Sequence, residues 1–120
     1  MKLKFPLLFL PLFFISCSGQ NCEALPGSYN SYEEATNQIR QSQFTFEEEL
    51  KSIDNESSWI TGAEFYSCDG STGYLIIEMQ GKHYLFNNFP KSEWQEFKGS
   101  ESKSKFYHEF IRGKYNFELK

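Results

Sequence analysis

The sequence contains few of the residues from which catalytic and metal sites are most often built. Its 120 residues include three cysteines and two histidines, and they contain no C-x-x-C pair. His83 and His108 do not have the spacing of metal ligands, either to each other or to a cysteine, so the common types of zinc site are excluded. The G-x-S-x-G motif of a nucleophile elbow is also missing. We therefore expect no cofactor, no metal and no catalytic residue.

Long hydrophobic runs are lacking as well. The apolar stretch from Phe5 to Ile15 is too short to cross a bilayer as a helix, which takes about 20 residues. Lys2 and Lys4 precede it, as in the positive end of a secretory signal. The stretch ends in Ser16-Cys17, which resembles a bacterial lipobox and predicts cleavage before a lipidated Cys17. The alternative is an ordinary signal followed by an ordinary cysteine.

Lipidation would place the protein in the cell envelope, with the membrane as a partner through a palmitate-bearing anchor. Ser18 follows Cys17 where an aspartate would signal retention in the inner membrane, so we expect the outer membrane. The sequence leaves open whether the domain faces the periplasm or the surface. It also leaves open the oligomeric state.

Positive charge is in deficit over most of the chain. The whole sequence carries a net charge of -4, and loss of Lys2 and Lys4 with the signal leaves 10 basic and 16 acidic residues, or -6. The basic residues gather after position 97, where residues 98–120 carry +3 and residues 17–97 carry -9. An acidic chain is a poor general binder of nucleic acid, whereas it suits a basic protein partner.

Two cysteines remain once Cys17 is assigned to the lipid. An even pair in an exported protein favours a disulfide between Cys22 and Cys68, although two free thiols are the alternative. Length allows one small domain. The expected division is a signal peptide at 1–16, a tether at 17–30, a helix and strand extension at 31–56, and a domain at 57–120.

Periodicity predicts an α+β fold, an antiparallel β-meander of three to four strands with a C-terminal helix pair packed on one face. A helix capped by Ser31 runs to about Gln41, and a strand with alternating apolar residues follows at 44–50. Strands at 59–66, 74–79 and 82–87 form the meander, with Gln80-Gly81 as a tight turn.

The two C-terminal helices are expected to cover the sheet. Pro90 is placed in the first turn of a helix that ends at Gly99, with Trp94 and Phe97 on one side. Ser100 or Ser102 caps the last helix, and Gly113 follows its end. Its i,i+4 pairs predict that Phe106 and Phe110 are buried against Leu75, Ile77 and Met79.

The order of landmarks from Ser57 to Tyr115 resembles the KTSC domain, a small domain named from the C-terminal region of some lysyl-tRNA synthetases. The matching positions are Ser57, Ser58, Leu75-x-Ile77-x-Met79, Gly81, Tyr84, Phe89-Pro90, Trp94, Phe97, Ser102, Phe106-Tyr107 and Ile111-Arg112-x-x-Tyr115. This chain has Phe86 where the family usually has a second tyrosine, and Glu101 where alanine is frequent. The resemblance implies a fold and no settled activity.

These observations predict a membrane-anchored lipoprotein whose KTSC-like domain is a non-catalytic protein-binding or envelope-associated module. One alternative is a nucleic-acid-binding domain, because aromatic residues accompany the basic ones between Tyr84 and Tyr115. A second alternative is a small hydrolase with its nucleophile at Ser57 or Ser58.

Overall fold

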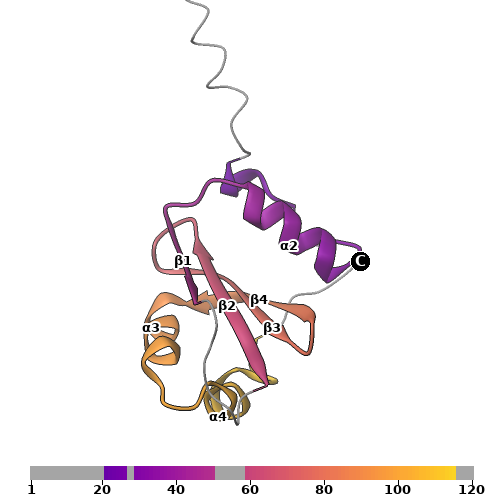
Figure 1. Cartoon of the computed structure of the whole chain (residues 1–120). Coiled ribbons are helices and arrows are strands. Elements are labelled where there is room, and N and C mark those ends of the chain that lie inside the picture. Colours follow the sequence, from indigo (N-terminus) through magenta and orange to yellow (C-terminus); the bar gives the residue numbers. More distant parts are fainter. Residues whose placement is uncertain (1–20, 27–28, 51–58, 116–120) are drawn as a thin grey trace, which may run out of the picture.

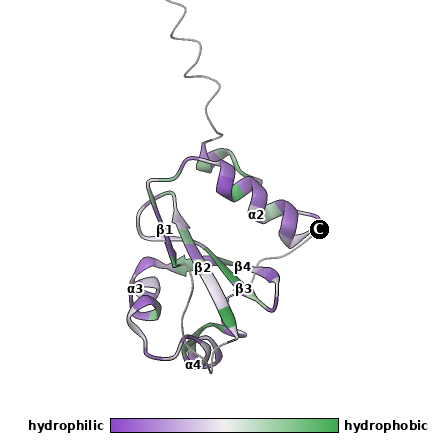
Figure 2. Cartoon of the chain, in the orientation of Figure 1, coloured by the Kyte–Doolittle hydropathy of each residue, from purple (hydrophilic) through white to green (hydrophobic). Residues whose placement is uncertain are grey.

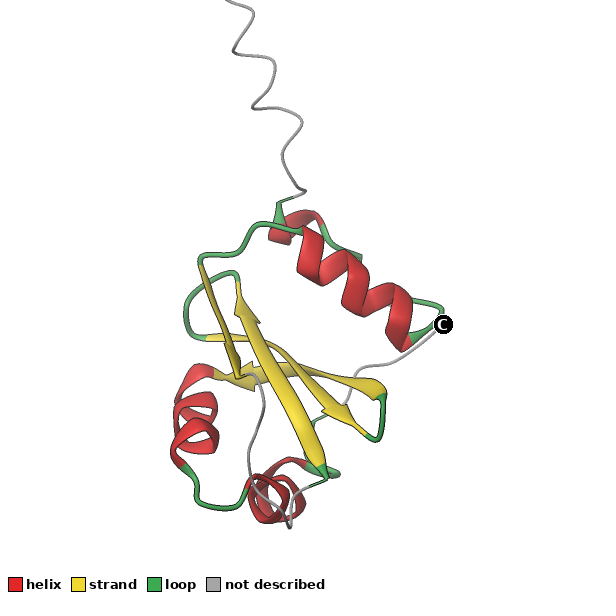
Figure 3. Ribbon diagram, in the orientation of Figure 1, coloured by secondary structure: helices red, strands yellow, loops and turns green. Residues whose placement is uncertain are grey.

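The fold is a four-stranded antiparallel sheet with helices on both faces (Figures 1 and 3). The computed structural model describes residues 21–26, 29–50 and 59–115. The elements are η2 (Cys22–Ala24), α2 (Tyr32–Gln41), β1 (Phe46–Leu50), β2 (Ile60–Ser67), β3 (Thr72–Met79), β4 (Lys82–Pro90), α3 (Lys91–Gly99), α4 (Lys103–Phe106) and η3 (Tyr107–Ile111). The strand order is β1-β2-β3-β4, which confirms the predicted meander and fold class. None of the helices in the described ranges has the length and apolarity needed to cross a membrane.

The β3–β4 hairpin turns where the sequence predicts it. Gln80 and Gly81 both have positive φ, at 53° and 79°, which is the pair of conformations that a tight type I′ hairpin turn requires. Gly81 adopts this conformation freely, whereas Gln80 adopts one that residues with a side chain rarely occupy. Met79 and Lys82 pair on either side of the turn.

A bulge in β4 extends that strand beyond its predicted end. The register shifts between the pairs Gly73↔Phe89 and Leu75↔Phe86, so one additional residue is accommodated in β4. Asn88 in this stretch has a φ of 56°, a conformation that asparagine tolerates better than most residues. As a result Phe86 and Phe89 both join the same hydrophobic core, although they are three positions apart.

The larger core lies between the sheet and the C-terminal helices. Its buried members are Ile60, Ala63, Phe65, Leu75, Ile77, Met79, Phe86, Phe89, Trp94, Phe97, Phe106 and Ile111. Phe65 stacks on Trp94 with ring centroids 5.5 Å apart, and the indole Nε1–H of Trp94 donates to Glu48 Oε1 at 2.6 Å. Glu48 also accepts from Lys98 Nζ at 2.8 Å, and these two hydrogen bonds lower its pKa. The predicted packing of a helix pair on one face is therefore confirmed.

The helix pair differs from its prediction at its first residue. Pro90 is the N-cap of α3 and the last residue of β4, one position before the helical turn in which the sequence placed it. The reason is the bulge, which keeps the chain extended as far as Pro90. Ser102, rather than Ser100, caps α4, and its hydroxyl accepts from the backbone N–H of Lys105 at 3.2 Å.

Helix α2 covers the opposite face of the sheet and closes a smaller core. The buried members there are Tyr29, Ala35, Ile39, Ile76 and Leu85. Figure 2 shows α2 as largely hydrophilic, with short hydrophobic stretches. The N-cap prediction is confirmed, because Ser31 Oγ accepts from the N–H of Glu34 at 3.1 Å. The Glu34 carboxylate accepts from Asn30 N–H, one residue before the partner that a standard capping box would use.

An ion pair joins α2 to the sheet beside this smaller core. Arg40 Nε donates to Glu64 Oε1 at 2.9 Å, and its Nη2 contacts Glu64 Oε2. The Tyr66 hydroxyl donates to the same Oε1 at 2.6 Å. Burial acts to raise the pKa of Glu64, but the hydrogen bonds from Arg40 and Tyr66 outweigh it and leave that pKa lowered.

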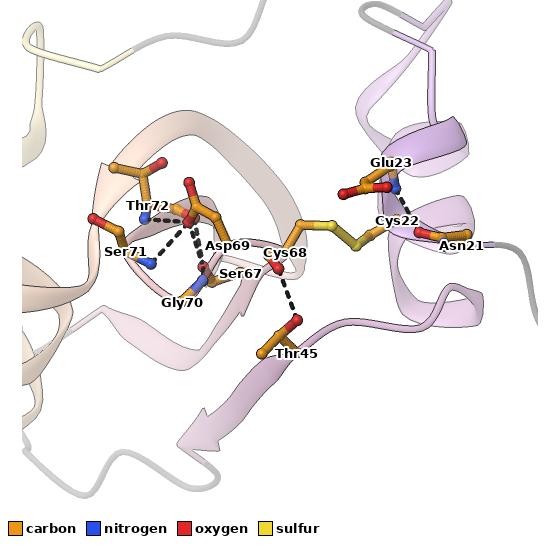
Figure 4. Close-up of a disulfide and its surroundings, with 10 residues drawn as sticks. All are labelled: Asn21, Cys22, Glu23, Thr45, Ser67, Cys68, Asp69, Gly70, Ser71 and Thr72. Atoms are coloured by element: carbon orange, nitrogen blue, oxygen red, sulfur yellow. Dashed lines mark hydrogen bonds between the residues drawn. A yellow bond between two sulfur atoms is a disulfide. The ribbon is translucent and has the colours of Figure 1, made fainter.

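The predicted disulfide between Cys22 and Cys68 is present, with Cα atoms 5.9 Å apart (Figure 4). It fastens η2 to the loop between β2 and β3, where Thr45 Oγ1 also donates to the Cys68 carbonyl at 2.7 Å. Asp69 Oδ1 accepts from the backbone N–H groups of Ser71 and Thr72, which lower its pKa. The bridge and the burial of Tyr29 show that the predicted tether at 17–30 is held against the domain over part of its length.

Candidate ligand-binding groove

An open groove lies where the β3–β4 hairpin meets the C-terminal end of the described chain. Its volume is about 440 Å³, within the range of small-molecule sites. We call it the aromatic groove, and its lining consists of Trp59, Met79, Gln80, Tyr84, Tyr107, His108 and Arg112. Gln80, with its positive φ, comes from the hairpin turn, and three of the others come from η3 or the residue after it.

The rings of the groove contact one another edge to face. Trp59 lies 5.9 Å from Tyr107 and 5.2 Å from His108, measured between ring centroids, with steep interplanar angles of 84° and 62°. Tyr107 rests in turn on buried Phe86 at 6.0 Å. Such arrangements are favourable for aromatic pairs and hold each ring in place. Trp59 is nevertheless 37% exposed, so part of its indole surface is open to a ligand.

A π-helical turn, η3, sets the direction of the side chains from Tyr107 onwards. The backbone N–H of Arg112 donates to the Tyr107 carbonyl at 2.8 Å, five residues back, where an α-helix would bond four residues back. Ile111, five positions after Phe106, is therefore the buried residue. Single π-helical turns of this kind are rare and occur frequently at functional sites.

The same turn makes one core prediction wrong. Phe110 is 43% exposed, although its i,i+4 spacing from Phe106 predicts burial of both rings. Phe106 is buried as expected, and the Phe110 ring packs on it at 4.8 Å from the solvent side. The extra residue per turn rotates Phe110 away from the sheet, which no feature of the residue pattern reveals.

Arg112 supplies the groove with an accessible cation. The side chain is exposed, and its Nη1 lies 3.4 Å from Nδ1 of His108. Over the described ranges, no carboxylate is within ion-pair distance of its guanidinium. Arginine carries five N–H donors in a planar fork, so an exposed guanidinium can offer several of them to a ligand.

The phenol of Tyr107 lies within electrostatic range of this cation. Burial raises the pKa of Tyr107, Arg112 opposes that effect, and the neighbouring phenols of Tyr84 and Tyr32 add to it. Tyr32 belongs to α2, and its ring lies 5.9 Å from that of Tyr84. A guanidinium and two phenols, all hydrogen-bond donors, thus line the same groove.

Only some of the residues singled out by the family resemblance meet in space. Tyr84, Tyr107 and Arg112 come together in the groove. Tyr115 instead packs edge-on against Phe89 at 4.9 Å, while Pro90 and Ser102 are helix caps. Ser57, Ser58 and Cys17 lie outside the described residues.

Four groove residues, Trp59, Met79, Gln80 and His108, were not predicted from the sequence as site residues. Met79 was expected only in the core, and His108 was considered only for metal binding or catalysis. Trp59 was assigned to the start of a strand, and its position just before β2 places it at the rim of the groove. Gln80 was assigned to a turn alone. The available signal was a polar residue in a tight turn beside aromatic strands, which is too common a pattern to indicate a site.

Each of the two histidines has charged or aromatic neighbours. His83 lies between two carboxylates, with Nδ1 3.5 Å from Glu33 Oε2 and Nε2 3.8 Å from Glu78 Oε2. His108 lies against Trp59 and Tyr107. Across the part of the chain that the structure describes, no three metal-ligating side chains gather in one place.

Comparison with known proteins identifies the domain to which the groove belongs. Residues 64–115 match the family model described as the KTSC domain, so this chain carries a KTSC domain. The match runs from within β2 to just beyond η3, and it contains every groove residue except Trp59. No curated protein and no solved structure matches the chain.

Proposed function

We propose that this protein is a lipid-anchored envelope protein whose KTSC domain binds a partner in the aromatic groove without catalysing a reaction. The observation that carries the proposal is the groove itself. It combines an exposed tryptophan, rings that contact one another and an exposed arginine in one concave site. Exposed aromatic and arginine side chains of this kind are the residues that dominate binding energies at interfaces.

The position of the anchor agrees with this role. In Figure 1, η2 lies at one end of the domain and α4 at the other, so the chain enters far from the helices beside the groove. A lipid on Cys17 would hold the η2 end toward the membrane and leave the groove directed away from it. The Cys22–Cys68 disulfide supports an exported location, because disulfides persist in the oxidising compartments outside the cytosol.

Anchoring is tested by the Cys17→Ala variant. We expect wild-type protein to incorporate labelled palmitate and to fractionate with the outer membrane, and the variant to lose both properties. The matched control is Ser18→Ala, which keeps the cysteine and should remain in the membrane fraction. A wild-type protein that takes up no palmitate would remove anchoring from the proposal.

Binding at the groove is tested by photo-cross-linking in cells. A photoreactive phenylalanine analogue replaces Trp59 at the groove or Glu49, which is exposed on the edge strand β1. We expect a discrete adduct from position 59 and none from position 49, and we expect unlabelled groove ligand to compete for it. Equal adducts from both positions would contradict a specific site.

The nucleic-acid alternative has less support from the distribution of cations. Lys98 is paired with Glu48, Lys103 Nζ donates to the Ser100 carbonyl, and Lys114 lies over the Phe110 ring. Strong binding to a polyanion needs several phosphates neutralised together, and it weakens steeply with salt. We therefore expect no low-micromolar binding of a labelled single-stranded RNA near about 150 mM salt. Such binding, lost in a Lys103→Ala/Lys105→Ala/Arg112→Ala/Lys114→Ala variant that still folds, would put this alternative first.

A further inference from the structure

We propose that the aromatic groove recognises an aromatic carboxylate, with the ring held against Trp59 and the carboxylate held by Arg112. The proposal rests on the proposed function, since it names the ligand chemistry of the same groove. Two sources can supply this chemistry, a free aromatic acid or the C-terminal aromatic residue of a protein chain.

The ring end of the groove follows from the geometry of Trp59. Its edge contacts with Tyr107 and His108 fix the indole while leaving 37% of the residue exposed. Met79 and Tyr84 line the same space and add apolar and aromatic surface. A flat ring entering the groove can therefore stack or pack edge-on without displacing a core residue. Water is a poor occupant of such a surface, so a ring gains by replacing it.

The anionic end follows from Arg112 and from the phenols that line the groove with it. Arg112 has no carboxylate partner in the described ranges, and the Tyr107 phenol is close enough for Arg112 to influence its ionisation. The planar guanidinium matches the two oxygens of a carboxylate, and charge-assisted hydrogen bonds are about twice as strong as neutral ones. An anion at this point would accept from the guanidinium and from neighbouring phenols together.

The charge of the groove and of the whole chain favours a ligand with one negative charge over a phosphate with two. Among the described residues that line the groove, Arg112 is the one permanent cation, and a mature chain of net charge -6 repels additional negative charge. Glu78 and Glu33 lie nearby on β3 and α2, where each contacts His83. A carboxylate brings one negative charge and matches one guanidinium, whereas a phosphate monoester brings nearly two at neutral pH.

The two indole N–H signals of the purified full-length chain provide a direct test by nuclear magnetic resonance. Trp59 lines the groove, whereas Trp94 is fully buried and bonded to Glu48. We expect N-acetylphenylalanine to shift the Trp59 indole signal saturably and to leave the Trp94 signal in place. N-acetylphenylalaninamide, which has the same ring without the charge, should bind about tenfold or more weakly. Phenyl phosphate should also bind more weakly than the acid.

Variants of Arg112 test whether this residue causes the preference for the acid over the amide. In Arg112→Gln the acid and the amide should bind equally, and in Arg112→Lys an intermediate preference should remain. Lys105→Gln removes an exposed cation of α4 that does not line the groove, so it should keep the wild-type preference. The tripeptide Gly-Gly-Phe distinguishes the sources. Binding tighter than N-acetylphenylalanine identifies a chain terminus, and equal or weaker binding identifies a free acid.

Several results would overturn the inference. These are equal binding of acid and amide to the wild type, a preference that survives in Arg112→Gln, tighter binding of phenyl phosphate, or no Trp59 shift up to about 10 mM acid. If position 59 still gives a specific cross-link in cells while the acid fails to bind, the ligand chemistry is wrong and the binding function stands. If neither a specific cross-link at position 59 nor binding of the acid is observed, both the ligand chemistry and the proposed binding function are wrong.

Discussion

The two faces of the sheet are built on different principles. The face under α3, α4 and η3 is an aromatic core in which Phe65, Trp94 and Phe97 are fully buried. The face under α2 has a smaller core and depends on polar links, namely the Arg40–Glu64–Tyr66 network and the nearby Cys22–Cys68 bridge. Burial of apolar area depends little on pH or redox state, whereas an ion pair weakens when its carboxylate is protonated and a disulfide is lost on reduction. Reductant should therefore act on the α2 face, whereas acid should act on both faces, because the aromatic face also holds the Glu48–Lys98 ion pair.

The largest loss of stability is expected from Trp94→Ala, which changes the aromatic face. Trp94 is fully buried, stacks on Phe65 and donates to Glu48, so its removal should lower the free energy of unfolding by about 3–5 kcal/mol. Trp59→Ala is the matched control, because this tryptophan is partly exposed in the groove and should cost about 1 kcal/mol. Urea denaturation followed by circular dichroism measures both. Equal costs would mean that the aromatic core does not carry the stability of this face.

The next largest loss of stability is expected from removal of the Cys22–Cys68 disulfide on the α2 side of the sheet. Replacing Cys22 and Cys68 by serine should lower the free energy of unfolding by about 2–4 kcal/mol, since the loop between them spans 46 residues. Reductant should destabilise the wild type by the same amount and leave the double variant unchanged. In a Cys17→Ala background, denatured wild-type protein should show no titratable thiol. Two free thiols there would contradict the bridge.

A smaller effect on stability, which depends on pH, is expected from Glu64. Its pKa is lower in the folded protein than in the unfolded chain, so the unfolded chain binds more protons as the pH falls. The stabilisation is fully present above the ordinary glutamate pKa of about 4.3 and is lost as the pH falls through the folded value. Glu64→Gln should cost about 1–2 kcal/mol at neutral pH and show a flatter dependence on acid than the wild type. Denaturation at a series of pH values measures this, with exposed Glu96→Gln keeping the wild-type profile.

The smallest effect is expected from Phe110→Ala. This ring is 43% exposed and covers Phe106 from outside, so the change should cost less than about 1 kcal/mol. Phe106→Ala, which removes a buried ring, should cost about 3 kcal/mol. Thermal denaturation separates the two. Similar costs would mean that the C-terminal segment follows a regular α-helix, with both rings on its buried side.

Much of the fold could be predicted because local signals and global packing agree. Ser31 and Glu34 marked the start of α2, Gln80-Gly81 marked the hairpin, and Trp94 and Phe97 marked the buried side of α3. The disulfide followed from the even pair of cysteines that is left when Cys17 is assigned to the predicted lipobox. Each of these features depends on residues close together in sequence or on simple counting.

The features that were not predicted are single-residue insertions in a strand and in a helix. The bulge at Asn88 and the π-helical turn at Tyr107–Ile111 each add one residue, and each changes which side chains face the core. Phe110 was predicted on the wrong side for this reason. The family resemblance picked out Tyr84, Tyr107 and Arg112, but only the folded chain shows that they surround the same space as Trp59.

The disulfide also determines how the domain responds to mechanical pulling. A force applied to the chain before Asn21 reaches Cys22 and crosses directly to Cys68 through the covalent bridge. Helix α2 and strands β1 and β2 lie within the closed loop between these two cysteines, so tension bypasses all three. The load enters instead at the start of the hairpin formed by β3 and β4. Reduction of the bridge would return α2 to the line of force and make it the first element to be peeled away.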